Sequence, residues 1–180
     1  MILTTNELLK NGETEYSIRN KIRNNELFLI ERGLYSDKQD YELNECYICK
    51  KYPNSIITGL SAFYLYNLTD YIPEYFYLAT EQHSFPIRRK DVKQSYQEEE
   101  YFRIGLCDLK VDDGVIHIYD FERLLIELVR LKEKYPKEIY YEVVNSFRKT
   151  RDKIDFYKVN DYCKFFSNGG SILIKIKEII

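Results

Sequence analysis

The first 36 residues combine a helical pattern with a hairpin pattern. Residues 14–24 repeat polar side chains at the three- and four-residue spacing of one helix face, with two isoleucines on the opposite side. The polar stripe consists of Tyr16, Arg19, Asn20 and Arg23, and the apolar side of Ile18 and Ile22. Asn25 can end this helix, because asparagine tolerates the left-handed conformation found after helix C-termini. Apolar residues at 27–30 and 34–35, on either side of Glu31-Arg32-Gly33, predict two short strands around a turn.

A shorter helix precedes this stretch. Thr4 and Glu7 have the spacing of a capping box, and Gly12 is suited to follow the last helical turn. Leu8 and Leu9 of this helix are expected to face the two isoleucines. Helix, turn, helix and hairpin in this order are typical of a winged helix-turn-helix domain, here without the additional helix that usually comes first.

Residues 37–180 predict a mixed domain that ends in helices. Residues 36–40 form a polar link of the right length for a domain boundary. Strands are predicted at 55–57, 75–79, 101–106 and in a hairpin at 109–119 that turns at Asp113-Gly114, and the polar residues 81–100 are expected to form a loop or an exposed ribbon. Helices are predicted at 40–52 (with Leu43, Cys46 and Tyr47 inward), from the cap Thr58 to about 68, at 120–134, 137–149 and 156–166, and from the cap Ser171 to 180.

Strands thus gather in the middle of the chain and helices at its end. This order predicts the α+β class rather than alternating α/β units. We expect a small winged helix-turn-helix head at residues 1–36, followed by an α+β domain at residues 37–180.

The charge balance limits the partners. The 180 residues include 27 Lys and Arg against 29 Asp and Glu, and residues 1–40 hold six basic and seven acidic residues. This balance argues against bulk coating of nucleic acid and against an anionic membrane surface, so any affinity for DNA must come from the local placement of cations. No run approaches the roughly 20 apolar residues of a membrane span, and the N-terminus lacks the pattern of a signal peptide. We therefore expect a cytoplasmic protein without membrane contact.

The four cysteines include one candidate pair for a metal or redox site. Cys46 and Cys49 have the spacing of half a zinc site or of a redox pair, but no second such pair exists, and His83 and His117 are distant in sequence. We therefore expect reduced, buried thiols and no metal.

The sequence has few of the patterns that catalysis requires. None of the seven glycines belongs to a phosphate-binding loop, and Gly59-Leu60-Ser61 lacks the second glycine of a nucleophile elbow. Glu122 and Arg123 could form a catalytic pair, but a glutamate in the first turn of a helix is ordinary, and we expect Arg123 to bind a neighbouring loop or carboxylate. We therefore predict a protein that is not an enzyme and needs no cofactor.

Four features follow one another along most of the chain. They are Arg-Gly-Leu-Tyr at 32–35; Tyr52-Pro53 with residues 56–62 (IITGLSA), 67–70 (NLTD) and 72–73; residues 119–128 (YDFERLLIEL); and Ile154-Asp155 before the terminal helices. In this order they resemble the AbiEi family of antitoxins from type IV, abortive-infection toxin-antitoxin systems. The chain departs from the family pattern at Asn67, Leu124 and Glu127, where the family has Gly, Thr and Asp.

The resemblance implies a phage-defence protein that represses its own operon. Such an antitoxin binds inverted repeats in its promoter through an N-terminal winged helix and counters a nucleotidyltransferase-type toxin, directly or only functionally. One head covers one half-site, so inverted repeats require two copies, either a dimer or monomers that pair on the DNA.

The outward stripe of residues 14–24 is the candidate DNA-binding site. A major groove admits one helix whose Arg and Asn side chains can make bidentate contacts to guanine and adenine, which assigns base reading to Arg19, Asn20 and Arg23. The residues assigned to the phosphates are Tyr16, Ser17, Asn24 and Arg32. An amphipathic surface helix with solvated charges explains the same stripe. In that alternative the head is only structural, and the protein acts through protein contacts.

Overall fold

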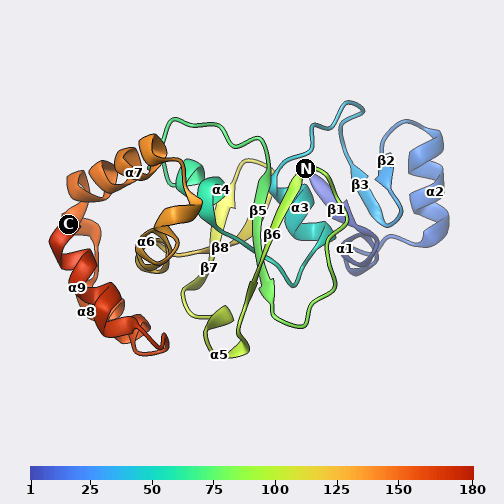
Figure 1. Ribbon diagram of the computed structural model, residues 1–180. Coiled ribbons are helices and arrows are strands. Elements are labelled where there is room, and N and C mark those ends of the chain that lie inside the picture. Colours follow the sequence, from blue (N-terminus) through green and yellow to red (C-terminus); the bar gives the residue numbers. More distant parts are fainter. The chain divides into compact units, whose positions relative to one another are not determined.

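The computed structural model describes residues 1–180 and confirms the α+β class, with nine α-helices and two β-sheets (Figure 1). Its internal contacts divide the chain into two compact units. Unit 1 consists of residues 1–54 and 109–116, and unit 2 of residues 55–108 and 117–180. The predicted boundary after residue 36 falls inside unit 1, and the division at that residue stays a prediction.

Unit 1 begins with a three-stranded antiparallel sheet and two helices. β2 (Phe28–Glu31) and β3 (Leu34–Ser36) form the predicted hairpin, and β1 (Ile2–Thr4) pairs with the other side of β3. The chain passes from β1 to β2 through α1 (Thr5–Lys10) and α2 (Glu15–Arg23). The sequence pattern does not predict β1, because three residues are too few to show the alternation of a strand.

Three of the four ends of α1 and α2 follow the predicted caps, and Thr14 adds a cap at the start of α2. The Thr4 hydroxyl accepts a hydrogen bond from the Glu7 backbone N–H at 3.1 Å, and Thr14 accepts one from Ser17 at the same distance. Gly12 and Asn25 follow the two helices with φ values of +88° and +58°, as the sequence predicts.

A small apolar core lies beneath α1 and α2. It contains Leu8, Ile18 and Leu27, against which Leu3, Ile22 and Tyr35 pack. Leu9 is 43% exposed, so the expectation that both leucines of α1 face α2 is wrong for Leu9. Adjacent helix positions point about 100° apart, and only one of the two leucines can point into this core.

The helix α3 (Glu45–Lys51) follows in unit 1. It begins later than predicted, because Asn44 caps it by accepting a hydrogen bond from the Tyr47 backbone N–H at 3.2 Å. Leu43 therefore precedes the helix and is exposed, which corrects the expectation that it points inward. Cys46 and Tyr47 are buried, as predicted.

The second sheet has five strands in the order β6-β5-β4-β8-β7. The strands are β4 (Ile56–Ile57), β5 (Phe76–Glu81), β6 (Val92–Gln97), β7 (Leu106–Val111) and β8 (Gly114–Tyr119). β4 pairs antiparallel with β5 and parallel with β8. The turn between β7 and β8 lies at the predicted position and belongs to unit 1.

The prediction of a loop or an exposed ribbon at 81–100 holds for residues 82–91 but is wrong for β6, and the predicted strand at 101–106 is also wrong. β6 pairs in parallel with the whole of β5, where a loop or an exposed ribbon was expected. β6 is at the edge of the sheet, and its polar residues do not show the apolar alternation that predicts a strand. The Gln94 side-chain amide donates a hydrogen bond to the Thr80 hydroxyl at 2.8 Å. The predicted strand at 101–106 is instead the helix α5 (Glu99–Phe102) and a turn at Gly105, whose φ of +79° is not that of a strand.

The other helices belong to unit 2. They are α4 (Gly59–Leu65), α6 (Phe121–Arg130), α7 (Lys137–Lys149), α8 (Phe156–Cys163), α9 (Gly169–Ile179) and the short 3₁₀-helices η1 (Lys132–Lys134) and η2 (Arg151–Lys153). Asp120 caps α6 as predicted, by accepting a hydrogen bond from the Arg123 backbone N–H at 2.9 Å. Four ends differ from the prediction: α4 ends at Leu65, α6 at Arg130 and α8 at Cys163, and the residue before α9 is Asn168 rather than Ser171. No helix combines the length and the apolar character needed to cross a membrane.

Candidate nucleic-acid interface

The outward face of α2 presents most of the predicted DNA-binding residues to solvent. Tyr16 is 74% exposed, and Arg19, Arg23 and Asn24 are also exposed. Asn20 is half-buried on the same helix. The buried Ile18 holds the opposite face against the core.

The N-terminal turn of α2 is occupied by carboxylates. The Ser17 hydroxyl donates to Glu13 Oε2 at 2.6 Å and accepts from the Thr14 backbone N–H at 2.8 Å. Glu13 also pairs with Lys21, and Glu15 lies 3.5 Å from an Nη atom of Arg19. Hydrogen bonds from Lys21 and Ser17 hold the pKa of Glu13 below its usual value, so this carboxylate stays charged at neutral pH. Negative charge at this end of the helix disfavours the binding of a phosphate there. The Ser17 hydroxyl is already engaged in the hydrogen bonds of the helix cap.

The C-terminal turn of α2 has the opposite character. Arg23 is exposed, and no carboxylate lies at ion-pair distance from it. Asn24 contacts Glu26 at 3.3 Å. The cationic part of this face is therefore concentrated at its C-terminal end.

The β2–β3 turn places Arg32 on the surface of the same unit. The turn residues are Arg32 and Gly33, and Gly33 has a φ of +84°, a conformation that favours glycine. The Thr5 backbone N–H donates to the Gly33 carbonyl at 3.0 Å, which ties the tip of the hairpin to the start of α1. Arg32 itself is exposed and has no ion-pair partner.

A hollow of about 420 Å³ lies between this turn and α3. It is lined by Thr4, Glu31, Arg32, Gly33, Leu34, Lys50 and Lys51. The ammonium of Lys50 pairs with Glu7, and that of Lys51 pairs with Glu31 and lies 3.3 Å from the Tyr47 hydroxyl.

The two lysines of the hollow are absent from the predicted site. They lie beyond residue 36, and two adjacent lysines in the last turn of a helix are explained by the helix dipole alone. Only the folded position of α3 beside the turn brings them next to Arg32.

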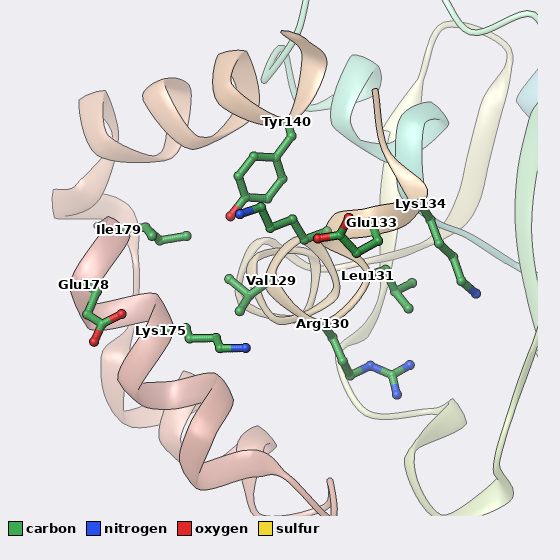
Figure 2. A pocket seen from close by; sticks show the side chains of 10 residues that line it. Val129, Arg130, Leu131, Glu133, Lys134, Tyr140, Lys175, Glu178 and Ile179 are labelled. Carbon is green, nitrogen blue, oxygen red and sulfur yellow. The ribbon is translucent and has the colours of Figure 1, made fainter. Parts of the chain in front are cut away.

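A second hollow, of about 470 Å³, lies among the C-terminal helices of unit 2 (Figure 2). Val129 and Tyr140 contribute buried apolar surface, and the Lys132 ammonium lies 5.3 Å from the centre of the Tyr140 ring. Lys175 extends from α9 below α6, and Arg130 points away from Tyr140 (Figure 2). The lining also includes Glu133 and Glu178, so charges of both signs surround an apolar floor.

The cysteines form no disulfide, and no group of three or more His, Cys, Asp or Glu side chains could hold a metal ion. Cys46 and Cys49 are buried in α3. Burial raises the pKa of Cys46 to about 11, so its thiol is protonated at neutral pH.

The sequence motifs at 67–70 and 119–128 contain residues that form hydrogen bonds within unit 2. Glu142 of α7 accepts hydrogen bonds from the Thr69 hydroxyl at 3.0 Å and from the Asp70 backbone N–H at 2.7 Å. Arg123 donates to the Tyr101 carbonyl of α5 at 2.9 Å and to Glu127 at 3.0 Å, which confirms the prediction that it binds a carboxylate. Comparison of the sequence with protein-family models and with curated proteins finds no match.

Proposed function

We propose that the protein is the antitoxin of a type IV toxin-antitoxin system, which binds inverted repeats in its own promoter, represses the operon and counters a nucleotidyltransferase-type toxin. It acts in the cytoplasm as a binding protein rather than as an enzyme. The observation that carries the DNA-binding part is an exposed polar helix beside a short hairpin, with Arg23 and Arg32 both without a carboxylate partner. The antitoxin part rests on the family resemblance of the sequence.

In this proposal α2 enters the major groove. Arg19, Asn20 and Arg23 read base edges, because guanidinium and amide groups match guanine and adenine. Arg32 at the hairpin tip contacts a phosphate or the adjacent minor groove, and the exposed Tyr16 and Asn24 fix the helix on the backbone. The weak overall charge means that affinity depends on these few contacts.

Fluorescence anisotropy tests the DNA-binding part directly. The full-length protein is titrated onto labelled DNA from upstream of its gene and onto a scrambled duplex, over a series of salt concentrations. We expect binding to the upstream DNA to be tighter by at least ~10³, with a modest salt dependence. Equal and weak binding to both duplexes would refute a sequence-reading head.

Substitutions on α2 test which residues read bases. Arg23→Ala and Arg19→Ala are each expected to lose roughly 1–3 kcal/mol of specific binding, because each removes a contact to a base. The matched control is Lys10→Ala, which removes an exposed lysine of α1 in the same unit. Wild-type affinity in both arginine variants would contradict the assignment.

A second candidate function is a protein-interaction module whose head is only structural. The carboxylates Glu13 and Glu15 favour it, because they engage Ser17 and Arg19 at the N-terminal end of α2. This candidate predicts that the α2 variants still neutralise a co-expressed toxin, encoded beside the gene, while no upstream DNA is bound. The main proposal predicts loss of operon repression in the same variants.

A further inference from the structure

The hollow beside the hairpin turn unites cations from two separate parts of the sequence. Arg32 comes from the turn, and Lys50 and Lys51 come from the last turn of α3. Among the lining residues these three are positive, and only Glu31 is negative. The chain as a whole has a net charge of -2, so the excess of positive charge among these lining residues is local.

We infer that this hollow binds a phosphate of the DNA backbone, so that α3 takes part in the nucleic-acid interface. The inference rests on the proposed DNA binding and extends it beyond residue 36. Phosphate oxygens accept hydrogen bonds from guanidinium and ammonium groups, and such contacts position a protein on DNA without reading its sequence. Lys50 and Lys51 are the added contacts, and the phosphodiester is their ligand.

The two ion pairs position the lysines without using all their donors. Side chains of Lys50 and Lys51 are only 18% and 24% exposed, so Glu7 and Glu31 hold them at the edge of the hollow rather than free in solvent. An ammonium has three N–H donors, and a carboxylate partner needs only one or two of them. A phosphate can therefore share each lysine with its carboxylate.

Glu31 allows a phosphate site to be distinguished from a purely structural ion pair. Its carboxylate lines the hollow and pairs with Lys51, so it repels a phosphate that approaches the same lysine. Removal of Lys51 and removal of Glu31 must then change DNA affinity in opposite directions. A purely structural ion pair predicts the same direction for both, because either substitution breaks the pair.

The test uses full-length variants on both the upstream and the scrambled duplex. Lys50→Gln and Lys51→Gln are expected to weaken binding to both duplexes by similar factors, and each to reduce the slope of log affinity against log salt by up to about 0.9, the contribution of one phosphate. Glu31→Gln is expected to strengthen binding to both. Lys10→Gln is the control for a surface lysine elsewhere in unit 1, and unfolding temperatures of all variants check that the fold is kept.

The outcomes separate this inference from the proposed function. If wild-type protein prefers the upstream DNA but the lysine variants keep its salt slope, the phosphate site is wrong and the sequence-reading head stands. If the lysine and glutamate variants shift affinity in opposite directions on both duplexes without any preference for upstream DNA, the phosphate site stands and the sequence-reading head is wrong. If Lys51→Gln and Glu31→Gln weaken binding alike, the pair is structural and the inference is overturned.

Discussion

Arg123 is fully buried in α6, where a charged side chain requires compensation. Its Nη2 atom lies 2.8 Å from Glu127, and the rings of Tyr119 and Phe166 lie 4.6 and 4.8 Å from its guanidinium carbon. A buried ion pair adds little net stability, but removing one partner leaves an uncompensated charge. The position is therefore intolerant of single substitution.

Arg123→Met is expected to lower the free energy of unfolding by about 3–5 kcal/mol, since Glu127 then loses its main buried partner. Urea unfolding followed by circular dichroism measures this. The double variant Arg123→Met/Glu127→Met should recover a large part of the loss, because no buried carboxylate remains. A single variant that is no less stable than the double one would contradict this account.

Glu7 predicts a pH dependence of stability in unit 1. Burial alone would raise its pKa, but hydrogen bonds from Lys50 and Thr4 outweigh burial and hold the pKa below the ordinary 4.5. A lowered pKa in the folded state means that the charged carboxylate stabilises the fold above about pH 4.5, and that this contribution is lost as the pH falls through the folded pKa. Glu7→Gln should therefore cost more stability at neutral pH than at about pH 3. Equal costs at both pH values, measured by urea unfolding, would contradict the sign.

At the scale of elements, sequence reasoning succeeded where the signal is local. Thr4 and Asp120 fix the starts of two helices, because a cap needs only its own residue and the three that follow. It failed at β6, which pairs in parallel with the preceding strand β5 and whose own residues are polar. A strand of this kind is defined by the neighbour it pairs with, and one sequence contains no direct record of that neighbour.

The connection between α8 and α9 also depends on a contact that sequence pattern does not show. A Cβ atom on Gly169 would lie 1.8 Å from the Cys163 carbonyl oxygen, whereas one on Gly170 would meet nothing within 4 Å. Gly169 therefore begins α9 because the backbone of α8 passes close to it. The predicted cap at Ser171 misses this packing requirement.

The two adjacent glycines form a matched pair for measurement. Gly169→Ala is expected to destabilise the protein by roughly 1–3 kcal/mol, because the backbone must shift to admit the methyl group. Gly170→Ala is expected to be neutral or to stabilise by up to about 1 kcal/mol, since alanine loses less entropy in a helix. Urea unfolding of both variants checks this, and similar effects in the two would contradict the close approach.

At the scale of the whole molecule, the candidate site could be predicted only in part. The stripe on α2 follows from the spacing of its own residues, and the structure leaves Arg19 and Arg23 exposed on it. Lys50 and Lys51 join Arg32 only through the folding of unit 1, which takes in residues 1–54 and 109–116. The polar link at 36–40 predicts a single boundary along the chain, whereas unit 1 consists of two separate segments of chain.

This organisation predicts how a fragment lacking residues 1–36 behaves. The helix α3 packs against β1 in unit 1, and its Cys46 and Cys49 are buried there. Deleting β1 removes part of the packing around α3, so both thiols should become more accessible and the pKa of Cys46 should fall from about 11 toward its ordinary value.

Thiol labelling read out by mass spectrometry distinguishes a shared unit from an independent head. In the fragment 37–180, Cys46 and Cys49 are expected to react with a thiol reagent at least tenfold faster than in the full-length protein. Cys163, buried in unit 2, serves as the internal control and should react at the same slow rate in both. Unchanged rates at Cys46 and Cys49 would mean that α3 keeps its burial without the first 36 residues, and the division into domains 1–36 and 37–180 would then describe the molecule better. Faster labelling of all three cysteines would show instead that the fragment fails to fold, and that unit 2 also depends on the residues removed.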